Sequence, residues 1–335
     1  MSIREAFERQ SRACADMGSP FMGRLMALLG AGLQPGDPVS DRVLHWQGDP
    51  GPSADSVPLR LAGGLHALKL QGIALGDVYP PHDVPDSALW QALVTAMNDH
   101  ADQLLDWLDR PPQTNEVRRS AVLIAALGEV ARRAPGRNVA LFELGASGGL
   151  NLWADHYGLS IGDDTFGADG SRVTLTPKWT GRLPVSETPL VTSRQGVDLS
   201  PLNPTNPADR LRFQAYLWPD QPERQDLTTA ALAIASTNPA SIAAGDAAAW
   251  LEDQLGTPRP ELNVVFHTVA WQYFPEATRE RAQNAMRNAA SATVQIGMEA
   301  DGQGPGAGVT LTDWPSGKIT AFGRADFHGR WIDWH

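Results

Sequence analysis

Cysteine is almost absent from this chain: Cys14 is the only one among 335 residues. A single cysteine excludes an intrachain disulfide and any metal site built from clustered cysteines. Its neighbours Ser11, Ala13 and Ala15 are small, which is typical of a cysteine that packs between helices. We therefore expect Cys14 to be structural, and we expect that the protein requires no metal.

Long apolar runs are absent as well. No window of about 18 apolar residues could span a bilayer, and the first ten residues lack the apolar core and cleavage site of a secretory signal. Hydrophobic residues make up 42% and charged residues 19%, an ordinary globular composition. The sequence predicts a soluble protein without a membrane partner, and a cytoplasmic location is the default expectation.

Basic residues are outnumbered: 27 Lys and Arg face 38 Asp and Glu, which gives a formal net charge of −11. Because affinity for nucleic acid rests mainly on Lys and Arg contacts to phosphates, this balance argues against a nucleic-acid partner. A small-molecule or protein substrate fits the charge better.

The first part of the chain has a helical pattern. Apolar residues recur every three to four positions, and clusters of Gly, Pro and Asp separate the periodic stretches. The predicted helices cover residues 5–15, 21–29, 58–71, 87–108 and 116–134, with a loop over 34–55. Pro135-Gly136 ends the last helix, so residues 1–136 are expected to form a helical N-terminal cap region.

After residue 136, short apolar runs alternate with helical ones, the pattern of a mainly parallel sheet with crossover helices. The strand candidates are residues 139–144, 190–198, 241–244, 263–267, 292–299, 308–312 and 330–334. The predicted fold class is α/β: a Rossmann-like domain over residues 137–335 with a seven-stranded sheet and antiparallel pairing at its C-terminal edge.

Residues from about 159 to 189 do not fit a minimal version of this fold. They contain Val173-Thr-Leu-Thr and Lys178-Trp-Thr-Gly, which favours a β-hairpin insertion. Because long loops in compact domains usually have a purpose, we expect a flap or a dimer contact here. The sequence is thus compatible with a homodimer.

The run from Val139 to Asn151 is typical of a buried strand, a glycine-rich turn and a helix start. Gly145, Gly148 and Gly149 carry no Cβ, so backbone N–H groups can approach a ligand closely, and the following helix adds its N-terminal dipole. Two chemistries use this geometry.

The first chemistry is methyl transfer. Acidic residues or histidine follow the predicted strand ends, and in a doubly wound sheet ligands bind outside these ends where the strand order reverses. With the spacing Glu-x-Gly-x-x-x-Gly, residues 137–335 resemble class I S-adenosylmethionine (SAM) dependent methyltransferases. The resemblance implies a methyltransferase-type sheet, SAM as cofactor, and cofactor contacts from Glu143, Gly145, Ser147, Gly149, Asp198 and Asp246. Ser147 stands where that family most often has glycine.

Further residues are predicted to serve the substrate. His267, at the end of the fourth strand candidate, could act as general base because an imidazole titrates near neutral pH. Candidate substrate or lid residues are Trp271 and Tyr273 beside it, and Gln113, Asn115, Glu116 and Arg118 from a polar run before the first strand. The predicted reaction is methyl transfer to a small molecule.

Two alternatives remain open. Gly145-Ala-Ser147-Gly-Gly149 also fits the Gly-x-Ser-x-Gly nucleophile elbow of α/β-hydrolases, in which Asp246, Asp301 or Asp313 would orient His328. Helices rather than strands precede Val139, which is unusual for that fold. The other alternative is a catalytically inactive SAM-fold protein that binds a ligand as a sensor.

The whole chain resembles one bacterial family. The motifs that carry this resemblance are Pro111-Pro-Gln-Thr-Asn-Glu-Val, Glu143-Leu-Gly-Ala-Ser-Gly-Gly-Leu-Asn-Leu, Asp198-Leu-Ser-Pro-Leu, Leu217-Trp-Pro-Asp-Gln-Pro-Glu-Arg and Phe266-His-Thr-Val-Ala-Trp-Gln-Tyr-Phe-Pro. The family is an uncharacterised domain of unknown function, the 2332 family, and implies no activity.

Overall fold

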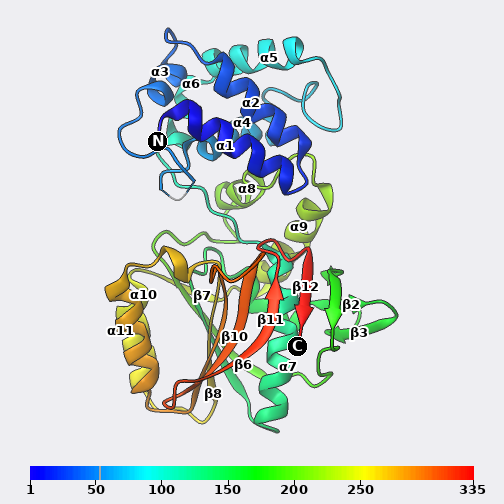
Figure 1. Ribbon diagram of the computed structural model, residues 1–335, viewed down its shortest axis with the longest axis vertical. Coiled ribbons are helices and arrows are strands. Elements are labelled where there is room, and N and C mark those ends of the chain that lie inside the picture. The colour runs from blue at the N-terminus through cyan, green and yellow to red at the C-terminus, as the bar shows by residue number, and fades with distance from the viewer. Residues whose placement is uncertain (53) are drawn as a thin grey trace. The chain divides into compact units, whose positions relative to one another are not determined.

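The computed structural model describes residues 1–52 and 54–335, and Figure 1 shows its helices and strands. The chain divides into two compact units: residues 1–114 with 207–226, and residues 115–206 with 227–335. We call them the helical unit and the α/β unit. No helix in the described ranges is long and apolar enough to cross a membrane.

The helical unit consists of short helices. It contains α1 (Ile3–Asp16), α2 (Pro20–Gly32), α3 (Pro38–Leu44), α4 (Val57–Leu70), α5 (Asp86–Asp99), α6 (Ala101–Leu108), α8 (Pro207–Ala215) and the start of α9 (Pro222–Thr237). Ser2 and Glu5 form a capping box at α1, and Asp37 caps α3. A short helix therefore lies within residues 34–55, where only a loop was expected.

A later stretch, residues 207–226, joins the helical unit through buried polar contacts. Asp220 accepts hydrogen bonds from the Ser19 hydroxyl and from Phe21 N, the latter at 3.0 Å. The buried His66 ring bonds to Ala215 O at 3.1 Å. The helices are therefore not the contiguous block that the sequence suggested, because a chain segment 100 residues further on completes their packing.

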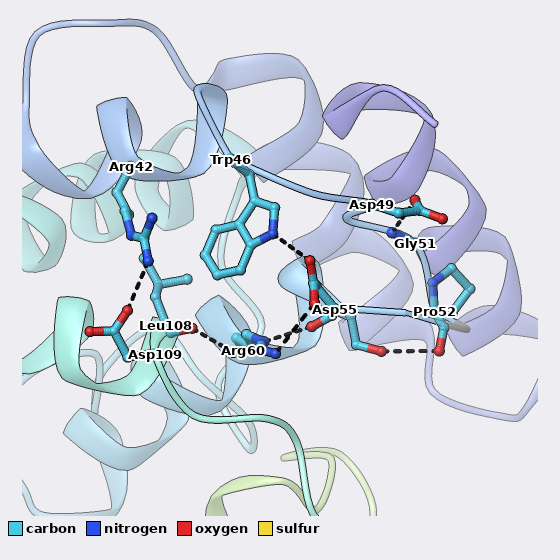
Figure 2. Close-up of polar contacts among 10 residues, drawn as sticks. Arg42, Trp46, Asp49, Gly51, Pro52, Asp55, Arg60, Leu108 and Asp109 are labelled. Carbon is cyan, nitrogen blue, oxygen red and sulfur yellow. Dashed lines mark hydrogen bonds and ion pairs between the residues drawn. The ribbon is translucent and has the colours of Figure 1, made fainter. Parts of the chain in front are cut away.

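Within the helical unit, Trp46 organises the loop that follows α3 (Figure 2). The Arg42 and Arg60 guanidinium groups lie 4.6 and 5.3 Å from the centre of the Trp46 ring. The indole N–H donates to Asp55 Oδ2 at 2.8 Å, and Arg60 donates to Leu108 O at 2.9 Å. The loop is thus tied to α3, α4 and the end of α6.

The α/β unit is built on a mixed, mostly parallel sheet of nine strands in the order β5-β12-β11-β10-β9-β8-β1-β6-β7. The strands are β1 (Val139–Leu144), β5 (Lys178–Gly181), β6 (Val191–Asp198), β7 (Ser241–Ala244), β8 (Leu262–Thr268), β9 (Thr293–Glu299), β10 (Ala307–Trp314), β11 (Lys318–Ala325) and β12 (Trp331–Trp334). Strands β7, β6, β1, β8 and β9 pair in parallel, and β9 to β12 form an antiparallel meander.

The expected number of seven strands was wrong, because β5 and β11 were not expected in the sheet. β11 has a polar sequence and pairs between β10 and β12, which were expected to be neighbours. β5 belongs to the insertion and pairs with β12, more than 150 residues later. Local periodicity cannot report such a distant partner.

The strand order reverses at β1. The chain continues from β1 to β6 and β7 on one side and then to β8 and β9 on the other. All six residues of β1 are buried, as expected for a central strand covered on both faces. We call the carboxyl ends of β1, β6, β8 and β9 the switch-point edge.

Helices cover the two faces of β1 differently. Phe142 and Leu144 pack in one cluster with residues of α10 (Ala247–Gly256) and α11 (Glu276–Arg287). Because side chains alternate along a strand, Glu143 points to the opposite face. That face is contacted by η2 (Leu150–His156), which also contacts η1 (Val117–Arg119) and α7 (Ser120–Arg133).

The insertion contains the expected hairpin and more. β2 (Gly158–Ile161) and β3 (Asp164–Gly167) pair antiparallel, and β4 (Thr174–Leu175) joins β2 in a separate three-stranded sheet. The rest of the insertion supplies β5 to the main sheet. β5 is therefore part of the scaffold, and a role of the insertion as flap or dimer contact stays a prediction.

Candidate functional site

The turn after β1 has a rare backbone conformation. The φ angles of Gly145, Ser147 and Gly149 are 71°, 51° and 69°. This left-handed region suits glycine, whereas a residue with a Cβ loses about 1–2 kcal/mol there. Ser147 therefore holds a strained position in the middle of the turn.

Most backbone donors of the turn after β1 are used by the chain itself. Five N–H groups donate over 2.7–3.0 Å to protein acceptors: those of Gly145, Ala146, Ser147, Gly149 and Leu150. Two of the acceptors are the side chains of Asp198 and Asn115. A phosphate group needs such N–H groups free, so this turn is poorly suited to bind one.

Glu143 is the most buried charged candidate, with 2% of its surface exposed. Burial raises the pKa of its carboxyl well above the usual value, and the nearby Asp198 raises it further. A hydrogen bond from Asn151 and the charge of Arg119 oppose these effects. Among the described residues Glu143 Oε2 has no hydrogen-bond partner, which costs about 1–3 kcal/mol. A donor on a ligand would recover this cost.

Asp198, at the end of β6, joins two turns. Its Oδ2 accepts from Ser147 N at 2.8 Å and its Oδ1 from Ser200 N at 2.9 Å. Its backbone oxygen accepts from Gly245 N at 3.0 Å. Because a carboxylate can accept about four hydrogen bonds, Asp198 retains capacity for hydroxyl groups of a ligand.

Asp246 is the N-cap of α10. Its carboxylate accepts from Ala249 N at 2.9 Å, from the Thr278 hydroxyl at 3.2 Å and from Arg281 at 3.4 Å. Capping and the link from α10 to α11 account for these bonds. Its role as a cofactor contact stays a prediction.

His267, the predicted base, is buried with both ring nitrogens occupied. Nδ1 lies 2.8 Å from Glu299 Oε1, and Nε2 lies 2.9 Å from Gln295 Nε2. Trp314 Nε1 donates to Gln295 Oε1 at 3.3 Å, which sets the orientation of that amide. In this network Nδ1 carries the proton and Nε2 accepts from Gln295, so the lone pair that a base requires is in use.

Glu299, at the end of β9, was not expected in the site. Burial would raise its pKa, but hydrogen bonds from His267, Ala270 N and Trp271 N hold the pKa below its usual value. The two N–H groups donate to Oε1 at 3.0 and 3.1 Å. Glu299 Oε2 is buried and has no hydrogen-bond partner within residues 1–52 and 54–335.

Glu143 and His267 lie on opposite faces of the sheet. His267 lies two residues after Val265 and shares its face, which packs in the cluster of α10 and α11, whereas Glu143 points to the face of η2. They meet at the switch-point edge: a Cβ on Gly145 would lie 2.7 Å from Ala270 Cβ, so the turn after β1 touches the segment after β8. The edge is thus continuous although its polar groups come from both faces.

Arg119 ties this edge together and was missed by the sequence analysis. Its guanidinium donates to Thr268 O at 2.9 Å and to Phe327 O at 2.8 Å. It is 9% exposed. The arginine joins η1 to the end of β8 and to the turn before β12, while its charge acts on Glu143.

A second strained residue follows β8. Val269 has a φ of 54°, and for a β-branched residue this is a genuine outlier. It holds this conformation while its N–H donates to Met298 O at 2.8 Å. Strain of this kind clusters at functional sites, and here Ser147 and Val269 follow adjacent central strands.

The polar run before α7 is brought to the same edge. Asn115 and Glu116 are buried, and Asn115 Oδ1 accepts from Leu150 N at 2.9 Å. Glu116 accepts from Arg118 N at 3.3 Å and caps η1. Gln113 falls in the helical unit instead.

The aromatic candidates differ in exposure. Trp271 stacks on His267 at 4.7 Å between ring centres and lies 5.7 Å from Phe274. Tyr273 is 62% exposed. Both stay predicted substrate contacts.

The residues of the hydrolase alternative are dispersed. Ser147 Oγ is buried and has no hydrogen-bond partner among the described residues. Asp301 pairs with Arg324, and Asp313 with Arg133. No histidine bonded to Ser147 therefore provides a base in the described part of the chain.

The sequence analysis missed five site residues. All of them lie in strands or helix starts, where a polar residue can be explained by its structural contacts alone. They are Arg119, Ser120, Asn151, Gln295 and Glu299. Ser120 donates to Asn151 Oδ1 at 2.8 Å. In the described ranges, no group of three His, Cys, Asp or Glu side chains could hold a metal ion.

The fold and this edge define an α/β protein with a polar site at the strand reversal of a mostly parallel sheet. The chain belongs to the family DUF2332, described as an uncharacterised protein conserved in bacteria, whose model matches residues 4–334. No curated protein and no solved structure matches the chain.

Proposed function

We propose that the α/β unit binds SAM at the switch-point edge and transfers its methyl group to a small molecule. The observation that carries the proposal is the polarity of the edge. Five backbone donors of the turn after β1 are used internally, while Glu143 Oε2 lacks a donor and Asp198 retains acceptor capacity. SAM offers donors, an ammonium group and ribose hydroxyls, whereas a dinucleotide would need N–H groups for its phosphates.

The strand order supports the proposal. The parallel order β7-β6-β1-β8-β9 reverses at β1, and open α/β sheets bind ligands at such a point. The antiparallel meander of β9 to β12 extends the parallel strands on one side only. It therefore leaves the reversal of strand order at β1 unchanged.

Each residue has a distinct role in this proposal. Glu143 receives the ammonium group, Asp198 receives the ribose hydroxyls, and the strained Ser147 keeps the turn close to the ligand. The sulfonium is already activated, so the protein mainly positions the reactants. Because the His267 lone pair is in use, the geometry favours a role for His267 in positioning Glu299 over a role as base.

Calorimetric titration with S-adenosylhomocysteine (SAH) tests the proposal. Glu143→Gln should weaken SAH binding by about 10-fold or more, since hydrogen bonds to charged groups are worth about 1.5–3 kcal/mol. Glu280→Gln is the matched control, because Glu280 is exposed on α11. Wild-type protein without affinity for SAH would overturn the proposal.

One observation favours serine hydrolysis as a second candidate: the left-handed backbone of Ser147, which is typical of a nucleophile elbow. The absence of a bonded histidine within the described ranges weighs against it. Stoichiometric labelling of Ser147 by a fluorophosphonate, lost in Ser147→Ala, would establish it.

A further inference from the structure

The carboxylate of Glu299 has two unlike oxygens. Oε1 receives three hydrogen bonds, from His267 Nδ1, Ala270 N and Trp271 N, at 2.8–3.1 Å. Oε2 is buried and receives none among the described residues. A buried carboxylate oxygen without a donor needs an explanation, such as a catalytic role or a bound water or ion.

The surroundings of Glu299 are acidic and closely connected. Ala270, whose N–H binds the carboxylate, touches the turn after β1 at Gly145. Glu143, which is 2% exposed, also has an unpartnered buried oxygen and lies at the end of β1, which β8 separates from β9. The carboxyl ends of β1, β6 and β9 thus each present one acidic side chain: Glu143, Asp198 and Glu299.

Charges of one sign select a ligand of the other sign. Arg119 donates to two backbone carbonyls at this edge, and its charge acts on Glu143. The donors on Glu299 Oε1 also keep its pKa low, so the group stays ionised although it is buried. An ionised acceptor in a poorly hydrated position favours an ammonium donor over a hydroxyl.

We propose that Glu299 Oε2 binds an ammonium group of the substrate, so that the second ligand of the switch-point edge is an alkylamine-type small molecule. This inference rests on the proposed function, which assigns the β1 side of the edge to the cofactor. The His267 ring holds the carboxylate in place from Oε1, and Gln295 and Trp314 hold the ring. His267 is therefore a positioning residue for this contact.

Ligand-observed NMR titration of the full chain tests the inference with two matched probes, n-butylammonium chloride and n-butanol, at constant ionic strength. Wild type should bind the ammonium at least about 10-fold more tightly than the alcohol. Glu299→Gln keeps an oxygen for the three donors and replaces Oε2 by an NH₂ group, so it should lose that preference. Asp301→Asn, an exposed acid that pairs with Arg324, should retain it.

Four outcomes are decisive. An equal affinity of wild type for both probes, or an unchanged preference in Glu299→Gln, overturns the inference. The same proteins are also titrated with SAH and with 5′-methylthioadenosine, which lacks the ammonium group. This comparison shows whether the ammonium group bound by Glu299 belongs to the cofactor or to the substrate. If Glu299→Gln loses affinity for SAH but not for methylthioadenosine, Glu299 binds the cofactor's ammonium and the substrate assignment is wrong. SAH binding without an ammonium preference overturns this inference alone, whereas absent SAH binding overturns the proposed function.

Discussion

At the scale of single residues, Glu143 places an unsatisfied carboxyl group at the end of a fully buried strand, β1. Its raised pKa means that the folded protein keeps the proton at pH values where the unfolded chain has released it. The unfolded state then binds fewer protons, so stability falls as the pH rises above the unfolded value.

Glu143→Gln should remove this loss of stability with rising pH. We expect similar stabilities of variant and wild type near pH 4, and a growing advantage of the variant as the pH rises toward the raised pKa. The difference should grow by at most about 1.4 kcal/mol per pH unit, the value for one proton. Urea unfolding at several pH values measures it, and a pH-independent difference would contradict the assignment.

Val269 allows a test of strain. Val269→Gly should raise the free energy of unfolding by roughly 1 kcal/mol, because glycine adopts φ near 54° without the cost that a β-branched residue pays. Val269→Ala, which keeps a Cβ, should gain less. Equal stability of all three proteins would show that the position is not strained.

His267 illustrates what a sequence can tell about a single residue. Its place at the end of a central strand was predicted, but its two hydrogen-bond partners, Glu299 and Gln295, both come from β9. Spacing along the chain does not report such contacts. The network predicts the less common neutral tautomer, with the proton on Nδ1. Long-range ¹H–¹⁵N correlation spectra should show it, and a proton on Nε2 at neutral pH would contradict the network.

At the scale of elements, the sequence predicted best where local patterns suffice. β1 and β7 begin and end at the predicted residues, and α1, α2 and α4 lie within a few residues of their predictions. β11 was missed although it forms a short antiparallel hairpin with β10, whereas the pairing of β5 with β12 was missed because it depends on contacts distant in sequence.

Substitution of Asp246, at the start of α10, distinguishes a capping role from a role in cofactor binding. Asp246→Ala should lower the free energy of unfolding by about 1 kcal/mol, since the cap of Ala249 N is lost. If capping is its main role, SAH affinity should change less than about threefold. A loss of tenfold or more would favour the predicted cofactor contact, and titration of the variant decides between them.

At the scale of the whole molecule, the chain forms two compact units, and the proposed ligand site belongs to one of them. A ligand stabilises the state that binds it by about 2.7 kcal/mol at a hundredfold excess over its dissociation constant. Differential scanning calorimetry of the full chain should therefore show that SAH raises the temperature of the transition that includes the α/β unit. Unchanged thermograms at saturating SAH would contradict this.

The most direct test of the account compares two ligands on one preparation of wild-type protein: SAH, which offers donors, and NAD⁺, which offers phosphates. Calorimetric titration should give micromolar binding of SAH and no measurable binding of NAD⁺, because five N–H groups of the turn after β1 are used internally while Glu143 lacks a donor. Binding of NAD⁺ with equal or higher affinity would contradict the central claim that acceptors, not donors, define this site.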